Sequence, residues 1–128
     1  MPEPASAFSY AIVRVVPDIE RGEFFNAGVL LFARQHDFLA ARVQLDRDRL
    51  AALCPDADHE SVDSALRAFV RVAEGDPGAG PMAALPKSER FGWLAAPSST
   101  VVQCSPAHTG LCSDPERALD ELFDDLVN

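Results

Sequence analysis

The sequence has little lysine, few cysteines and no long apolar run. Lys87 is the only lysine among 11 basic residues, whereas acidic residues number 20, so the formal net charge is −9. Because Lys and Arg supply most of the affinity for nucleic-acid phosphates, we do not expect nucleic-acid binding. No apolar run reaches the roughly 18 residues of a membrane helix, and no basic segment with an apolar core opens the chain. We therefore expect a cytoplasmic protein that contacts no membrane.

The cysteines indicate neither a disulfide framework nor a zinc site. Cys54, Cys104 and Cys112 are an odd number, which favours free thiols. Cys104, His108 and Cys112 have metal-like spacing, but a structural zinc ion needs four ligands and the paired C-x2-C signature is missing. Cys104 with His108 as a nucleophile pair would need a geometry that spacing alone does not indicate. We expect no metal and no cofactor.

A chain of 128 residues is long enough for one domain, and we place that domain at residues 8–128 after a disordered lead at residues 1–7. Two apolar runs, Phe8–Val16 and Ala27–Ala33, lack polar alternation and predict buried strands. Gly28 indicates a bulge or a close backbone approach. Arg14 interrupts the first strand, and it needs a carboxylate or carbonyl partner if buried or reaches solvent if it lies near the strand end.

A third strand, Phe38–Leu45, alternates and is expected to have one solvent-facing side. Three aspartates then stand where helices are expected to begin. Asp46, Asp58 and Asp114 each precede an apolar pattern of helical period, and Asp is favoured just before a first helical turn. They predict a short helix, a longer helix over His59–Glu74 and a C-terminal helix.

The segment between the last two helices is expected to hold a flexible loop, a short helix, a strand and a turn. These pieces are residues 75–81 (GDPGAGP), a helix from Ser88, a strand over Thr100–Cys104 and a turn over Pro106–Leu111. We thus predict the α+β class, with a small, mainly antiparallel sheet of three to four strands. Three or four helices are expected to pack on one side of it, in a single domain.

Three longer segments occur in one order along the chain. They are YAIVRVVPDIERGEFFNAGVLLF from Tyr10, ERFGWLAAPSSTVVQCSPAHTGL from Glu89 and DPERALDELFDDLV from Asp114. In these segments the chain resembles the bacterial domain-of-unknown-function family numbered 3037, from about Phe8 to Val127. The resemblance implies no established activity and no catalytic residues. It does imply a candidate partner, a HipA-like kinase-fold protein, because members of this family are often encoded beside one.

Polar residues in two distant loops form a candidate site. Arg21 and Glu23 lie in the loop after the first strand, and His108 lies in the expected turn. If the two loops converge, His108 could act as an acid, a base or an anion contact near neutral pH. If they do not, Arg21 and Glu23 form an ion pair that braces their own loop. The candidate set comprises charged and hydrogen-bonding residues: Arg14, Arg21, Glu23, Ser99, Thr100, His108 and Thr109.

We expect a non-catalytic accessory protein that binds a protein partner, with a HipA-like kinase as first candidate. Its interface would be the acidic C-terminal helix, the Arg21 loop or an exposed sheet edge, and a homodimer is left open. The alternative is a small enzyme or anionic-metabolite-binding domain that uses the Arg21/Glu23 loop and the His108 turn. A third interpretation, substrate or inhibitor of that kinase, predicts phosphorylation within residues 98–100.

Overall fold

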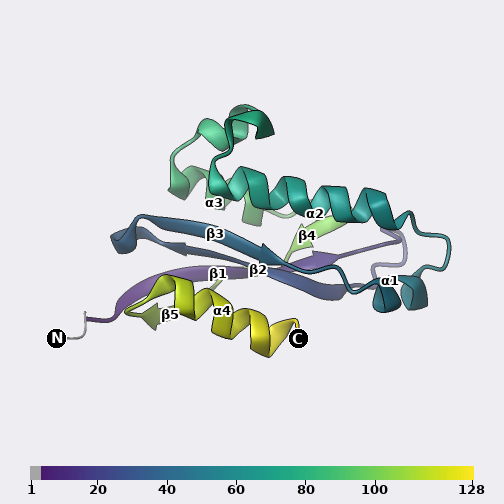
Figure 1. Ribbon diagram of the computed structural model, residues 1–128, viewed down its shortest axis with the longest axis horizontal. Helices are drawn as coiled ribbons and strands as arrows, with labels where there is room; N and C mark the ends of the chain where they lie inside the picture. Colours follow the sequence, from purple (N-terminus) through teal and green to yellow (C-terminus); the bar gives the residue numbers. More distant parts are fainter. Residues whose placement is uncertain (1–3) are drawn as a thin grey trace.

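A hairpin of two long strands forms the centre of the fold. In the computed structural model, which describes residues 4–128, β1 (Ser6–Val15) pairs antiparallel with β2 (Phe25–Ala33). Both alternating side-chain sets of this hairpin are largely apolar because helices cover both faces of the sheet (Figure 1). The two expected strands are confirmed, and each begins two residues earlier than expected. The expected disordered lead overlaps β1 at its end, and its first three residues lie outside the described part of the chain.

Three shorter strands complete the antiparallel sheet. β3 (Phe38–Val43) pairs with β2, whereas β4 (Val102–Cys104) and β5 (His108–Cys112) both pair with the opposite edge of β1. The order is β3-β2-β1-β4, and β5 lies along the N-terminal half of β1, where β4 does not reach. The turn expected at residues 106–111 is therefore wrong: most of it is β5, a strand formed by pairing with β1, which local propensity did not indicate. The described sheet has five strands, one more than expected.

The helices begin where the aspartates predict. The side chains of Asp46, Asp58 and Asp114 accept backbone N–H groups of the first turn of α1, α2 and α4 respectively. The third helix, α3, begins after Pro86 without such a cap. The α-helices and the short 3-10 helices are α1 (Arg47–Leu53), α2 (His59–Glu74), α3 (Lys87–Ala95), α4 (Pro115–Leu126), η1 (Arg34–His36), η2 (Pro77–Ala79) and η3 (Pro81–Ala84).

The helices lie on both faces of the sheet, and the expectation that they share one side is wrong. Figure 1 shows α2 and α3 above the sheet and α4 below it. Leu50 of α1 and Leu66 of α2 join the core cluster that contains Val13, Val15 and Leu30. A second cluster, on the face of α4, consists of Phe8, Val29, Leu31, Ala33, Leu119 and Phe123. A strand buried on both faces explains the continuous apolar runs of β1 and β2.

The expected solvent-facing side of β3 is covered by α4. Arg42 of β3 places its guanidinium 4.3 Å from the centroid of the Phe123 ring, and its Nη1 is 2.8 Å from Oδ1 of Asp120. Arg42 thus covers apolar surface with its stem and ring contact while its charge pairs with the acidic helix. The outward-facing Arg predicted from alternation is present, but a helix lies over the same side of the sheet.

Gly28 serves both purposes that its position indicated. The register of the β1–β2 ladder shifts between Val13 and Arg14, where Val13 pairs with Gly28 and Arg14 pairs with Asn26. A Cβ on Gly28 would lie 2.5 Å from the carbonyl oxygen of Arg42, so the neighbouring strand leaves no room for a side chain. The extra residue switches which β2 side chains face α2, so that Phe25, Ala27 and Leu30 all join the core cluster on that face.

The glycine-rich segment at residues 75–81 is more structured than the expected flexible loop. Asp76 accepts a 2.9 Å bond from Nε of Arg71 and another from the backbone nitrogen of Gly78, and η2 follows. The bond from Arg71 holds the pKa of Asp76 below its ordinary value.

Among the helices that residues 4–128 form, none has the length and apolar character needed to cross a bilayer.

Candidate functional site

The predicted polar residues separate into two groups in the structure. Arg21 and Glu23 lie in the loop between β1 and β2, where Arg21 Nε is 2.6 Å from Glu23 Oε1. Both side chains are exposed, and the hydrogen bond that Arg21 donates to Glu23 raises the pKa of Arg21 above its ordinary value. This geometry is that of an ion pair bracing its own loop, and such exposed pairs contribute little stability.

His108 and Thr109 lie far from that loop, on β5. His108 pairs with Tyr10 and Thr109 pairs with Ser9, in the N-terminal half of β1. The Arg21 loop begins beyond Val15, at the other end of the same strand. Five residues of extended strand, from Tyr10 to Val15, span about 17 Å at 3.3–3.4 Å per residue. The two loops do not converge, so the structure brings together no shared Arg21–His108 site.

The two cysteines with metal-like spacing, Cys104 and Cys112, also lie far apart along β1. Cys104 pairs with Val13 and Cys112 pairs with Ser6, which are seven strand residues apart, or about 23 Å. Within residues 4–128 no group of three or more His, Cys, Asp or Glu side chains has a geometry that could hold a metal ion. Burial raises the pKa of the Cys104 thiol to about 12, which disfavours the thiolate that a nucleophile requires.

Arg14 and Ser99, by contrast, do lie around one cavity. This Arg14 cavity has a volume of about 330 Å³ and opens between the β1–β2 loop and the segment before β4. Its lining residues are Arg14, Val16, Ile19, Gly22, Phe24, Ser98, Ser99, Gln103 and Cys104. Thr100 does not line it, but its hydroxyl donates to the Val102 carbonyl at 2.7 Å and so fixes the loop that carries Ser99.

Within residues 4–128, Arg14 has neither the carboxylate nor the carbonyl partner expected for a buried arginine. The side chain is half-buried, its guanidinium lies 4.2 Å from the centroid of the Phe24 ring, and no ion pair joins it to any residue of 4–128. Its Nε is buried and has no hydrogen-bond partner. The positive charge of Arg14 acts on the Cys104 thiol, opposing the effect of burial on that pKa. Arg14 therefore places a partly desolvated charge on the wall of an open cavity.

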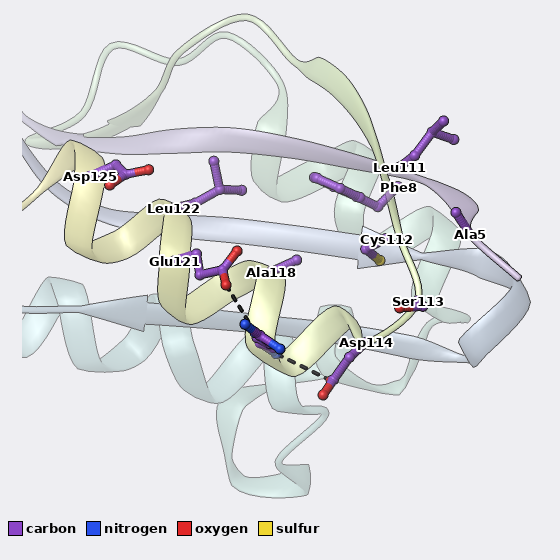
Figure 2. Close-up of a pocket in the computed structure, with 11 residues that line it drawn as sticks. Ala5, Phe8, Leu111, Cys112, Ser113, Asp114, Ala118, Glu121, Leu122 and Asp125 are labelled. Carbon is purple, nitrogen blue, oxygen red and sulfur yellow. Dashed lines mark hydrogen bonds and ion pairs between the residues drawn. The ribbon is translucent and has the colours of Figure 1, made fainter. Parts of the chain in front are cut away.

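A second, larger surface feature lies between β5 and α4, and Figure 2 shows its lining residues. This β5–α4 groove has a volume of about 530 Å³. Its apolar floor includes Phe8 and Leu122, and Leu111 lies exposed at its edge. Its rim carries charged residues of α4 and its cap: Asp114, Arg117, Glu121 and Asp125. Arg117 Nε donates to Glu121 at 2.9 Å, and Asp114 accepts the backbone nitrogen of Arg117.

The free edge of β5 runs along this groove. β5 pairs with β1 on one side, and no strand formed by residues 4–128 pairs with its other side. Leu111, next to the last residue of β5, leaves 73% of its surface exposed. Sequence reasoning missed this surface because residues 106–111 were interpreted as a turn. No local signal identified the strand, because Ala107 and Gly110 are of residue types that are depleted in strands and β5 forms by pairing with β1.

These features define a small α+β domain with an antiparallel sheet between two helical layers and two open surface sites at one sheet edge. The chain belongs to the family described as "Protein of unknown function (DUF3037)", whose model matches residues 10–127. This match confirms the family resemblance seen in the sequence. Searches of curated proteins and of solved structures gave no match. The family description assigns no activity, so function has to be argued from the two surface sites.

Proposed function

We propose that this chain is a non-catalytic interaction protein that binds a partner through the β5 edge and the β5–α4 groove. The observation that carries the proposal is the free edge of β5, along which backbone N–H and C=O groups are available for a further strand. Edge strands recognise extended segments by ladder hydrogen bonds, while adjacent pockets select alternate side chains. The exposed Leu111 and the apolar floor of the groove supply such a pocket.

The charge of the groove favours a basic segment as the occupant. Its rim carries three acidic residues and one arginine, and that arginine is already paired with Glu121. Asp125 has no hydrogen bond or ion pair within the part of the chain that the structure describes. Two copies of this chain would bring two acidic α4 helices together, which disfavours a homodimer at this surface. We infer that the partner presents an extended segment with apolar and basic side chains.

A HipA-like kinase-fold protein, the kind of protein that members of the resembled family are often encoded beside, is the first candidate partner, in the cytoplasm. This part of the proposal rests on the family resemblance and not on the groove. The alternative of a small enzyme relied on Arg21 and His108 acting together, and their separation along β1 leaves it without a shared site. The exposed residues 98–100 stay open as phosphorylation sites, which mass spectrometry of the chain after incubation with the kinase would detect.

The test is capture of the candidate kinase by the tagged chain after co-expression. We expect stoichiometric capture by the unmodified chain and loss of capture for Leu111→Lys, because a lysine at a strand edge opposes strand addition and repels a basic segment. Trp93→Lys is the matched control, since Trp93 is 63% exposed on α3, on the other side of the sheet. Capture by this control should be unchanged.

Two outcomes would contradict the proposal. Leu111→Lys with undiminished capture would show that the β5 edge is not the interface. A homodimer in light scattering that Leu111→Lys dissociates would show that the edge accepts a second copy instead of a basic partner segment. Failure to capture the kinase would reject that partner, and a peptide array of basic and acidic extended segments would then test the groove itself.

A further inference from the structure

We propose that the Arg14 cavity binds a small oxyanion, the phosphate or carboxylate group of a metabolite. The proposal stands on the geometry of this cavity and is independent of the partner at the β5 edge. No α4 or β5 residue lines the cavity, so the two sites can be tested separately.

The first observation is that Arg14 differs from the other basic residues. Eight of them form ion pairs with carboxylates within residues 4–128: Arg21, Arg42, Arg47, Arg49, Arg67, Arg71, Lys87 and Arg117. Arg90 is the most buried of the remainder, and its Nη1 donates to the Ala83 carbonyl at 3.0 Å. Arg14 is half-buried and makes only a ring contact. Arg34 also makes only a ring contact, but it is exposed. Arg14 is therefore the one half-buried lysine or arginine that has no ion pair within residues 4–128.

The second observation is that the guanidinium is partly desolvated. The Phe24 ring lies 4.2 Å from it, and within residues 4–128 its Nε is buried without a hydrogen-bond partner, as is Nε of Arg90. Of these two arginines, only Arg14 lines the cavity. A buried donor without a partner is unfavourable, and an oxyanion at the cavity wall would supply both acceptor oxygens and the missing opposite charge. Arg is well suited to this role because its planar fork can donate two parallel bonds to phosphate or carboxylate.

The third observation is that the rest of the lining is uncharged and includes a free hydroxyl. Arg14 is the only charged residue among the nine that line the cavity. Thr100 uses its proton on the Val102 carbonyl, so in the 3.2 Å contact with Ser98 the proton comes from Ser98. Ser99 makes no hydrogen bond within residues 4–128, and its hydroxyl is the one left to donate to a ligand.

Two of the three acids in the β1–β2 loop are already engaged, and the third, Glu20, is exposed and does not line the cavity. Glu23 pairs with Arg21, and Asp18 accepts the backbone nitrogens of Glu20 and Arg21. None of these acids lines the cavity, although their charge will weaken binding at low salt. A volume of about 330 Å³ lies at the lower end of ligand pockets, which suits a small phosphorylated or carboxylated metabolite better than a nucleotide.

The experiment is a nitrogen-15 NMR titration with inorganic phosphate, and separately with acetate, against sodium chloride at equal ionic strength. We expect saturable shifts of the amides of Gly22, Ser99 and Gln103 with at least one of the two oxyanions. Arg14→Gln should weaken the response about tenfold or more, as expected for loss of a charged donor. Which anion saturates first shows whether the site prefers phosphate or carboxylate.

Two further variants keep the test decisive. Arg34→Gln is the matched control, because Arg34 also lies over a phenyl ring, at 5.5 Å from the centroid of Phe32, but is exposed. It should leave the titration unchanged. Ser99→Asp keeps Arg14 and places a carboxylate at the cavity, and it should abolish the saturable response in a folded protein. A response that is absent with both anions, that survives Ser99→Asp, or that Arg34→Gln reduces equally would overturn the proposal.

Discussion

Two halves of one sheet edge carry surfaces of opposite charge. Along the N-terminal half of β1, β5 and α4 form a groove with an acidic rim, whereas beside its C-terminal half Arg14 is the only charged residue of its cavity. The position of α4 accounts for the difference. This helix begins beside β5, packs on β2 and β3, and ends where Leu126 accepts a 3.1 Å bond from Asn26. Acidic side chains of α4 line the groove, and none of them lines the cavity.

This comparison shows how a chain with a net charge of −9 can still present a local positive site. The six acids of residues 114–128 outnumber the single Arg117, but one helix confines them to one part of the surface. Net charge describes steering and solubility at long range, whereas a ligand senses the groups that line its own site. Substitutions at the groove and at the cavity should therefore affect the two sites independently.

Truncation of the Phe123 side chain should disrupt the β5–α4 groove and leave the Arg14 cavity intact. Phe123 is buried between α4 and β2, so Phe123→Ala is expected to lower the free energy of unfolding by about 3–5 kcal/mol, measured by urea denaturation. Partner capture at the groove should fall because α4 forms its wall, while the oxyanion response of Arg14 should persist in the folded fraction.

Leu66→Ala is the matched control for that variant. Leu66 is fully buried in α2 on the opposite face, and its truncation should cost about 2–5 kcal/mol without altering either surface. Equal loss of capture in the two variants, at matched folded fraction, would refute the assignment of the groove to α4.

A smaller effect is expected at Gly110, in the middle of β5. A Cβ at this position would lie 2.6 Å from Cζ of Phe8, so Gly110→Ala should displace the ring or the strand and destabilise the protein by about 1–3 kcal/mol. NMR shift changes should concentrate on β5 and the groove. Gly92→Ala is the control, because a Cβ there meets nothing within 4 Å and should stabilise α3 by up to about 1 kcal/mol. Unchanged β5 signals in Gly110→Ala would contradict the tight packing under Phe8.

The smallest effect is expected at Asp58, the cap of α2, which touches neither surface. The side-chain bond from Ser61, with further backbone bonds, holds the pKa of Asp58 below its ordinary value of 3.8. A carboxyl whose folded pKa is lowered contributes stability that is present above its unfolded pKa and is lost as pH falls through the folded pKa.

The unfolding free energies of the wild type and Asp58→Asn should therefore converge as pH falls below 3.8. Urea denaturation at several pH values measures this, and Ser61→Ala should reduce the convergence because it removes the largest cause of the pKa shift. A constant difference between wild type and Asp58→Asn across this pH range would exclude the linkage. Both surface sites should respond normally in all these variants.

Much of the fold was predictable because its signals are local. The helix α2 begins after Asp58 and ends before Gly75, as expected. The aspartate accepts first-turn N–H groups, and the glycine has a left-handed conformation. The central strands were predicted from apolar runs, which reflect cover on both faces. β5 was missed because its exposed side chains resemble a turn and its stability comes from Phe8 and the rest of β1, which are distant in the sequence.

The candidate site was only partly predictable for the same reason. Arg14 was recognised as an unusual residue in an apolar strand, and it does line a cavity with Ser99. Grouping Arg21 with His108 required knowing which half of β1 each would adjoin, and that depends on a register set by long-range pairing.

Local signals specify the helices, the caps of α1, α2 and α4, the two buried strands and the acidic character of the last helix, and the sequence also carries the family resemblance. Long-range packing places the helices on both faces of the sheet, makes residues 108–112 an edge strand and leaves Arg14 without a carboxylate partner within residues 4–128. The two groups of features differ because the interactions that form them act over different distances along the chain. Capping and hydrophobic period act within a few residues, whereas strand pairing and the distribution of charge around a cavity join residues that are far apart along the chain.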